Sequence, residues 1–148
     1  MKLTSSAFQD NQPIPVIYTC EGNNINPPLT ITDVPPLAKS LALIVEDIDA
    51  PRGTFTHWIM WDIPANIHEI QQSTFPEGAV SGINDFGNFG YGGPCPPSGT
   101  HRYYFRLFAL NDMLSLSPET PKKEVVSSIM AHLIEDYDLV GIYSHTLH

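Results

Sequence analysis

Two histidines and one aspartate stand at the ends of apolar segments, where a side chain can serve a binding site. Asp47 follows the segment Ser40–Glu46, His57 begins the segment that ends at Ile63, and His101 leads into a third apolar run. A carboxylate close to imidazoles favours their protonated, hydrogen-donating form, which creates a small socket for negative charge. We therefore expect these three side chains to bind an anion of the phosphate type.

Glycines are concentrated just before the third of these segments. Gly87, Gly90, Gly92 and Gly93 fall within seven residues and are followed by the stretch 94–99, which contains three prolines and one cysteine. Such a loop can bring its backbone close to a ligand and aim N–H groups at it. It lacks the Lys and Ser/Thr of a P-loop and precedes a strand rather than a helix, which argues against nucleotide binding of that type.

Each of these residues also has a structural interpretation. A histidine at a strand end is often a satisfied structural group, and Asp47 and Asp49 could bond their own backbone in a turn. An aspartate and two histidines could instead hold iron or zinc, or act as an acid and base in ester hydrolysis. Because an aspartate that orients imidazole protons toward an anion is the simpler use of these groups, we expect no metal, no cofactor and no catalysis.

Short apolar segments separated by proline, glycine and asparagine predict an all-β protein. Proline pairs break the chain between segments, since proline cannot donate to a β-ladder. The expected strands are Val16–Thr19, Leu29–Thr32, Ser40–Glu46, His57–Ile63, Tyr103–Leu110 and Leu139–Tyr143.

One segment departs from the β pattern. Thr120 is a candidate N-cap, Pro121 suits the first helical position, and apolar residues then recur at intervals of four. We expect one amphipathic helix from about Pro121 to Asp136, packed on a sheet face. The predicted architecture is a single domain, residues 1–148, with two antiparallel sheets and one helix near the C-terminus.

The alternation of side chains along strands brings the candidate site together. In the segment from Ser40 the apolar face leads to Asp47, and in the next segment His57 shares a face with Ile59, Trp61 and Ile63. If the two strands form a hairpin, Asp47 lies beside His57.

The same parity applies to the third segment. His101 shares a face with Tyr103, Phe105, Leu107 and Ala109, so that a histidine again stands at the leading end. We expect His101 to join the other two side chains.

Composition excludes several partners. The chain of 148 residues has 7 Lys and Arg against 16 Asp and Glu, a formal charge of -9, which disfavours nucleic acid and anionic membranes. We expect a cytoplasmic protein with no secretory signal and no spanning segment. Cys20 and Cys95 are too few for a disulfide framework, but whether they pair is left open.

The order of motifs resembles the phosphatidylethanolamine-binding protein family, and in particular its bacterial and archaeal branch of Raf-kinase-inhibitor-like proteins. The resemblance runs through nearly the whole chain. It is carried by the segments 47–51, 56–58, 62–64, 90–97 and 99–103.

The resemblance implies two packed antiparallel sheets with an anion pocket at one end. The pocket would accept phosphate or the head group of phosphoethanolamine through Asp47, His57, His101 and Tyr103. Gly92, Gly93 and Pro94 would form its wall, while Asp49 and Pro51 would brace a loop. It further implies a homodimer and, as an alternative function, inhibition of a protein kinase or serine protease. Ile48 replaces the proline usual between the two aspartates, and the terminal segments of eukaryotic members are missing.

Overall fold

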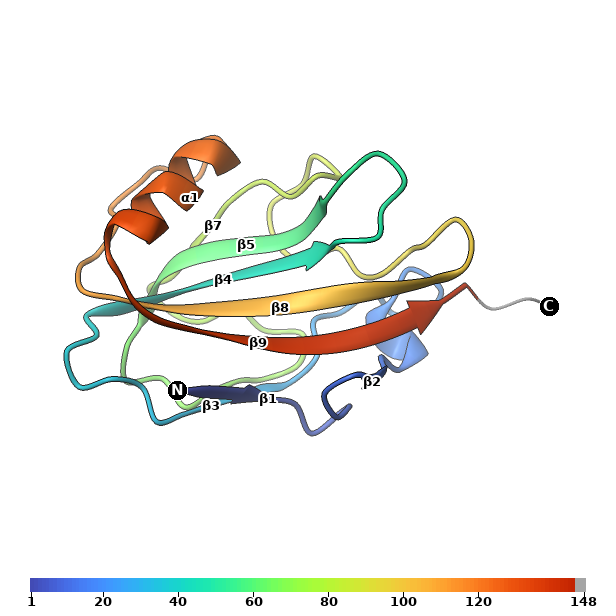
Figure 1. The fold of residues 1–148 in the computed structure, drawn as a ribbon, viewed down its shortest axis with the longest axis horizontal. Coiled ribbons are helices and arrows are strands. Elements are labelled where there is room, and N and C mark those ends of the chain that lie inside the picture. Colours follow the sequence, from blue (N-terminus) through green and yellow to red (C-terminus); the bar gives the residue numbers. More distant parts are fainter. Residues whose placement is uncertain (146–148) are drawn as a thin grey trace.

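Two β-sheets and one helix are stacked in layers in the computed structural model, which describes residues 1–145 (Figure 1). The small sheet has the order β1–β3–β6 and the large one β2–β9–β8–β4–β5–β7. All strand pairs are antiparallel except β2 with β9. The predicted two-sheet sandwich with a helix is thereby confirmed. The elements are β1 Lys2–Thr4, β2 Gln12–Pro13, the 3-10 helix η1 Val16–Tyr18, β3 Leu29–Thr32, β4 Ser40–Asp47, β5 Phe55–Pro64, β6 Glu69–Ile70, β7 Val80–Ser81, β8 Thr100–Leu110, α1 Lys122–Ala131 and β9 Leu133–Ser144.

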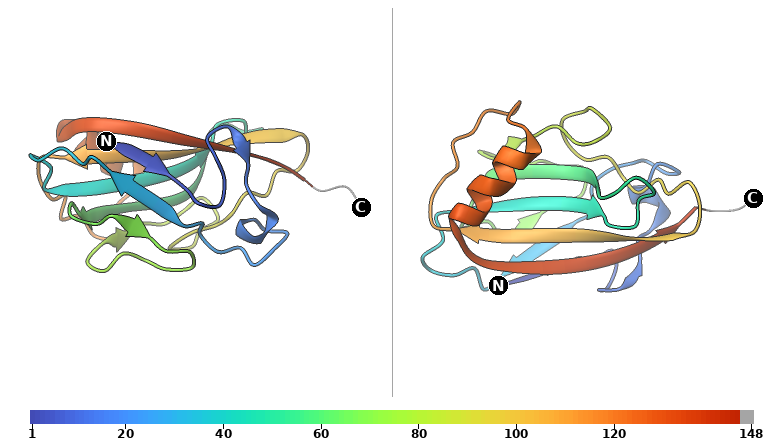
Figure 2. Two further views of the ribbon diagram at one scale, coloured as in Figure 1. Left: turned by 90° about the horizontal axis from the view of Figure 1, so that it is seen from below. Right: turned by 45° about the horizontal axis from the view of Figure 1, so that its top comes forward.

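The large sheet is buried on both faces, which explains why its central strands are apolar almost throughout. Along β4, Leu41, Leu43 and Val45 face the small sheet, whereas Ala42 and Ile44 face the helix layer. Figure 2 shows α1 lying across one end of the large sheet, on the face away from the small sheet. That helix leaves the opposite end of the sheet uncovered, and the polar strand ends lie there.

The segment Val16–Thr19 was predicted as a strand and is instead a 3-10 turn, Val16–Tyr18. The backbone N–H and the hydroxyl of Thr19 both donate to the carbonyl of Val16, at 3.0 and 2.8 Å. Val16 is half exposed, so an extended backbone would gain little stability from packing of its β-branched side chain. Local hydrogen bonds therefore decide the conformation here.

The predicted helix from Pro121 to Asp136 is too long at both ends. α1 begins at Lys122 with Pro121 at the N-cap, and it ends at Ala131. Leu133 already pairs with Leu110 as the first residue of β9. The apolar repeat continues beyond Ala131 because the sheet needs apolar residues there too, and pairing with the long strand β8 prevails over helical periodicity.

Cys20 and Cys95, whose pairing the sequence left open, form a disulfide with an S–S distance of 2.07 Å. It joins residues 75 positions apart, linking the turn after η1 to the loop before β8.

Residues 1–145 contain no helix with the length and apolar character that a transmembrane span requires.

Candidate functional site

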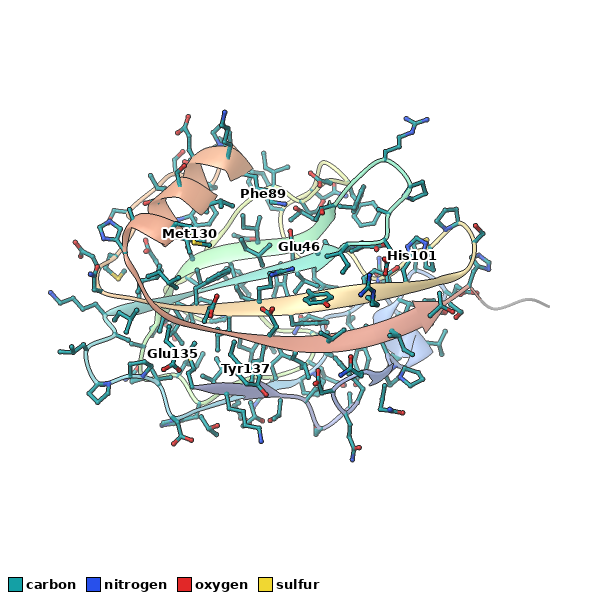
Figure 3. The ribbon with its side chains drawn as sticks, in the orientation of Figure 1. Glu46, Phe89, His101, Met130, Glu135 and Tyr137 are labelled. Atoms are coloured by element: carbon teal, nitrogen blue, oxygen red, sulfur yellow. A yellow bond between two sulfur atoms is a disulfide. The ribbon has the colours of Figure 1, made fainter. Side chains whose placement is uncertain are left out.

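Three strand ends meet at the end of the large sheet that α1 leaves uncovered. Asp47 ends β4, and its register partners are Phe55 at the start of β5 and Tyr103 near the start of β8. His101 lies on β8 at this same end, as labelled in Figure 3. Because β4 runs antiparallel to both β5 and β8, the C-terminal end of β4 lies beside the N-terminal ends of β5 and β8.

Asp47 and His101 form a buried pair. The imidazole Nδ1–H of His101 donates to Asp47 Oδ2 at 2.6 Å, and the two residues are only 7% and 4% exposed. The second carboxylate oxygen accepts the backbone N–H of Asp49 at 2.8 Å. With Nδ1 engaged in this way, Nε2 is the ring nitrogen of His101 that can meet a ligand.

His57 stands at a β-bulge rather than on a regular strand. Val45 pairs with Trp58 and Glu46 with Thr56, which leaves His57 as the extra residue of β5. A bulge re-aims the side chain it carries, and here the His57 ring comes within 5.2 Å of the Tyr103 ring, measured between centroids.

One expectation for this strand is wrong because of the bulge. His57 does not share a face with Ile59 and Trp61, which pack in the helix-side core. The expected hairpin exists, and although its register pairs Asp47 with Phe55, Asp47 and His57 line the same cavity. The alternation of apolar and polar residues along a strand does not reveal where an extra residue is inserted, so this pattern alone could not locate the bulge.

The orientation of His57 is fixed by the glycine-rich loop. Its Nδ1–H donates to the carbonyl oxygen of Gly92 at 2.7 Å, and the backbone N–H of Gly92 donates back to the carbonyl of His57 at 2.9 Å. A Cβ on Gly92 would collide with the ring of Phe86, another lining residue, so a larger residue here would have to displace that ring. Gly92 thus positions His57 from behind.

Burial lowers the pKa of His57, and the hydrogen bond to Gly92 and the charge of Asp47 oppose that shift only in part. The expected effect of Asp47, a protonated ring, is outweighed at this position by desolvation. A neutral ring that donates from Nδ1 presents an unprotonated Nε2 to the cavity. A fully ionised oxygen can be received there only when the ring takes up a proton.

Tyr103 lies beneath both imidazoles. Its ring centroid is 5.2 Å from that of His57 and 6.5 Å from that of His101. Burial and the nearby Asp47 carboxylate raise the pKa of its hydroxyl, so the group stays protonated as a donor. The carboxylate of Asp47 and the backbone of Cys95 lie close to this hydroxyl, but within the described chain neither makes a hydrogen bond of good geometry with it. An unpartnered buried donor beside two imidazoles is suited to a ligand oxygen.

A cavity of about 180 Å³ opens over these groups. Gly92, Gly93 and Pro94, expected as its wall, lie behind the surface instead, because Gly92 faces His57 and Gly93 packs on the backbone of Tyr18. Aromatic and proline side chains that no periodicity had indicated take their place. The lining residues are Asp47, Ala50, Pro51, Phe55, His57, Phe86, Cys95, Pro97 and His101.

Asp49 ties the loop after β4 to β8. Its carboxylate accepts the backbone N–H, Nε–H and Nη2–H of Arg102, each at 2.9 Å. The side-chain hydrogen bonds from Arg102 hold the pKa of Asp49 at about 2. Pro51, expected only to brace this loop, also lines the cavity. The guanidinium of Arg102 is therefore committed to the loop.

The polar groups of this end do not form a metal cluster. Among residues 1–145, no three His, Cys, Asp or Glu side chains are arranged to hold a metal ion. What they offer to the cavity is two imidazole Nε2 atoms within an apolar rim, while Tyr103 is fully buried and is not one of the lining residues. The two imidazoles can make hydrogen bonds to one small oxyanion.

Comparison with known proteins gives a consistent result. A sequence profile of the phosphatidylethanolamine-binding protein family matches residues 4–144. A UPF0098 protein of Methanothermobacter thermautotrophicus is 45% identical, with 97% of this chain and 98% of that protein covered. One from Pyrococcus horikoshii is 47% identical, covering 94% of this chain and 74% of that protein.

Solved structures agree in fold. A crystal structure of a phosphatidylethanolamine-binding protein homologue from Chlamydia trachomatis superposes with a TM-score of 0.93 at 40% identity, with 97% of each chain covered. The structure of Escherichia coli YbcL, described as a member of the mammalian family of such proteins, gives 0.91 at 30% identity over 98% of each chain.

Proposed function

The chain belongs to the phosphatidylethanolamine-binding protein family, and from this we propose that its cavity binds a small phosphoryl anion, such as phosphate or the head group of phosphoethanolamine, without transforming it. Binding of that kind needs few groups: directed hydrogen-bond donors at the floor and a wall that limits size. Both are present at the end of the sheet formed by β4, β5 and β8.

The orientation of the two imidazoles is the observation that carries this proposal. His57 uses Nδ1 on Gly92 and His101 uses Nδ1 on Asp47, so the Nε2 atoms remain for a ligand. Each ring is held in place by a buried hydrogen bond before any ligand arrives, which reduces the entropy that binding must remove. We expect the hydroxyl of Tyr103, which is fully buried and makes no hydrogen bond of good geometry within the described chain, to add a third donor from beneath the lining residues.

The charge balance supports a weak, screened interaction rather than a tight one. Arg102 is bonded to Asp49, and the whole chain carries a formal charge of -9. Attraction therefore depends on imidazoles that are protonated by, or together with, the ligand. Affinity should rise as the pH falls toward 6 and decrease with added salt.

The test is a calorimetric titration with phosphoethanolamine in a buffer free of phosphate. We expect saturable binding by the parent chain and at least tenfold weaker binding by His57→Ala, because a charge-assisted hydrogen bond contributes about 1.5–3 kcal/mol. His68→Ala, an exposed histidine at the other end of the molecule, is the matched control and should bind like the parent. Equal affinity of parent and His57→Ala would refute the proposal.

A further inference from the structure

The disulfide stands at the cavity itself. Cys95 is one of the lining residues, and both Cys20 and Cys95 are exposed to solvent. A thiol reagent from solution can therefore reach the bond, and a ligand in the cavity lies beside it. Exposed disulfides of this kind are the ones that take part in exchange chemistry, whereas fully buried ones resist it.

The loop that the disulfide anchors also sets the orientation of His57. Residues 91–94 are held against residues 18–24 by three hydrogen bonds in addition to the disulfide. The hydroxyl of Tyr91 donates to the carbonyl of Tyr18 at 2.6 Å, the N–H of Gly93 to Asn24 Oδ1 at 2.8 Å, and the N–H of Cys20 to the carbonyl of Pro94 at 3.1 Å. Gly92, within this segment, receives Nδ1–H of His57.

Beyond Pro94 the loop is less supported. From Cys95 to Gly99 every residue except Pro96 is exposed, and β8 begins only at Thr100. The disulfide is thus the covalent link that holds the part of the loop forming one side of the cavity. Cys95 and Pro97 contribute to the lining from this part, and the backbone of Cys95 also lies next to the Tyr103 hydroxyl.

We propose that the Cys20–Cys95 bond is a reducible site that controls the affinity of the cavity for its anion. A dithiol reductant supplies the two electrons: its thiolate attacks one sulfur of the bond and forms a mixed disulfide, and its second thiol displaces the remaining cysteine. The products are two cysteine thiols and one oxidised, disulfide-bonded reductant, so electrons and protons balance. The three hydrogen bonds of residues 91–94 do not involve the disulfide and hold that segment in place, while residues 95–99 gain freedom.

Reduction weakens anion binding because the ligand must then order the loop that the disulfide had already fixed. An ordering cost of this kind corresponds to about a fivefold to tenfold loss of affinity. Linkage requires the reverse effect as well: the bound anion makes the disulfide harder to reduce by the same factor. The affinity effect rests on the proposed function, but the release of residues 95–99, from which Cys95 lines the cavity together with His57, does not.

The experiment uses phosphoethanolamine as the probe and dithiothreitol as the dithiol. Oxidised chain, reduced chain and the double variant Cys20→Ser with Cys95→Ser are titrated in the calorimeter, with alkylation and mass measurement confirming the redox state. We expect the reduced chain and the variant to bind about fivefold to tenfold more weakly than the oxidised chain. Dithiothreitol should leave the variant unchanged, which separates the disulfide from other effects of the reductant.

A second readout is the NMR signal of the His57 ring, followed in the same samples without ligand. We expect it to shift on reduction, while the signal of His68 stays in place. Oxidised and reduced chains with equal affinity and the same His57 signal would overturn the inference. If the oxidised chain fails to bind the probe but the His57 signal still shifts on reduction, the proposed ligand is wrong and the link between disulfide and site stands. Should the double variant not fold, the reduced parent chain gives the same comparison.

Discussion

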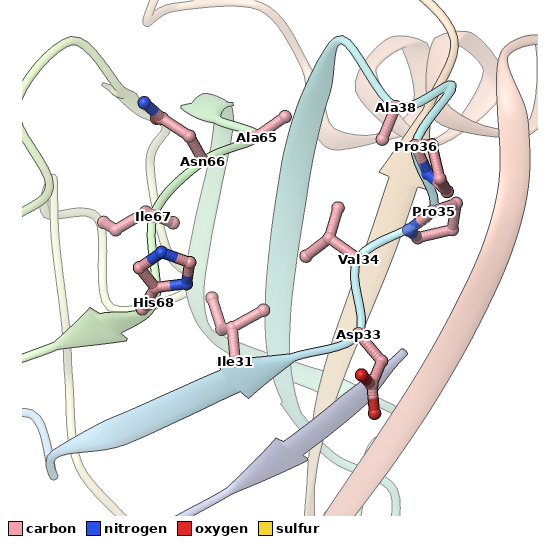
Figure 4. Close-up of a pocket in the computed structure, with 10 residues that line it drawn as sticks. All are labelled: Ile31, Asp33, Val34, Pro35, Pro36, Ala38, Ala65, Asn66, Ile67 and His68. Carbon is pink, nitrogen blue, oxygen red and sulfur yellow. The ribbon is translucent and has the colours of Figure 1, made fainter.

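The two ends of the sandwich each carry a hollow with an aspartate and a histidine, but only one is built as a binding site. The hollow between β3, β4, β5 and β6 contains Asp33 and His68 and measures about 370 Å³ (Figure 4). The cavity over Asp47 and His101 measures about 180 Å³. The larger hollow holds its polar residues on exposed loops, whereas the smaller one holds them on strand ends with almost no exposure.

The difference shows that preorganisation, not volume, distinguishes the candidate site. At the small cavity each imidazole is already fixed by a partner, and the strand register sets the spacing between them. At the large hollow the histidine side chain is free to rotate in solvent, and apolar residues such as Ile31, Val34 and Ile67 form much of the lining. A rigid arrangement binds better for the same contacts because less freedom is lost.

The largest expected difference between the two ends concerns stability. Asp47→Ala removes the carboxylate that holds buried His101 and leaves the Nδ1–H of that ring without an acceptor, and an unsatisfied buried donor costs about 1–3 kcal/mol of the free energy of unfolding. Asp33→Asn, on an exposed loop at a left-handed φ of 56° that asparagine tolerates, should change it by less than about 0.5 kcal/mol. Urea unfolding of both variants measures the two values. Similar losses at the two ends would remove the distinction drawn here.

Binding should show the next largest difference. His101→Ala is expected to weaken phosphoethanolamine binding about tenfold to a hundredfold, since it removes one of two imidazole contacts. His101→Gln keeps a side chain that can reach Asp47 and should recover part of the loss. Calorimetric titration at pH 6.5 measures each affinity. Wild-type affinity in His101→Ala would leave the fixed pair without a role in binding.

The pH dependence of stability offers a third contrast. Burial lowers the pKa of His57 below its usual value of 6.5, so the native state favours the neutral ring. The resulting stability is fully present above pH 6.5 and is lost as the pH falls below it, because the unfolded chain then takes up the proton more readily. Unfolding followed from pH 8 to 5 should show this decline in the parent and a flatter profile in His57→Gln. The profile of His68→Gln should match the parent.

The smallest effect is expected from Asp49, which binds Arg102 and so holds the loop after β4. Because the pKa of the Asp49 carboxyl group is about 2, its ionised form stabilises the protein above pH 4, and this stability is lost as the pH falls toward 2. Because Asp49 and Arg102 are partly exposed, solvent screening keeps this contribution small. Asp49→Asn should therefore flatten only the acid end of the stability profile and weaken anion binding by about twofold or less. A loss as large as that of Asp47→Ala would mean that the loop is part of the site.

Much of this arrangement could be predicted from the sequence, because strand alternation is a strong local signal. The face shared by His101 and Tyr103 followed directly from it, as did the layered sheets. The position of His57 did not follow, since a single inserted residue changes the face of everything beyond it. The bulge orients the side chain of His57 toward the site.

Other features depended on competition that the sequence does not reveal. The repeat after Pro121 fits a helix as far as Asp136, but β8 offers partners from Leu133 onward. Val16 has a strand-forming side chain in a segment whose hydrogen bonds are satisfied locally. Cys20 and Cys95 meet only because two loops that are far apart in sequence are packed together. Tertiary context decided the helix end and the disulfide, whereas local hydrogen bonds decided the turn at Val16.

The most direct test of the central claim is an NMR titration of the imidazole rings with phosphoethanolamine at pH 6.5. The account predicts that the Nε2 signals of His57 and His101 move together and saturate at one ligand per chain, while His68 does not respond. A response of His68 with no change at His57 and His101, or shifts that never saturate, would contradict it.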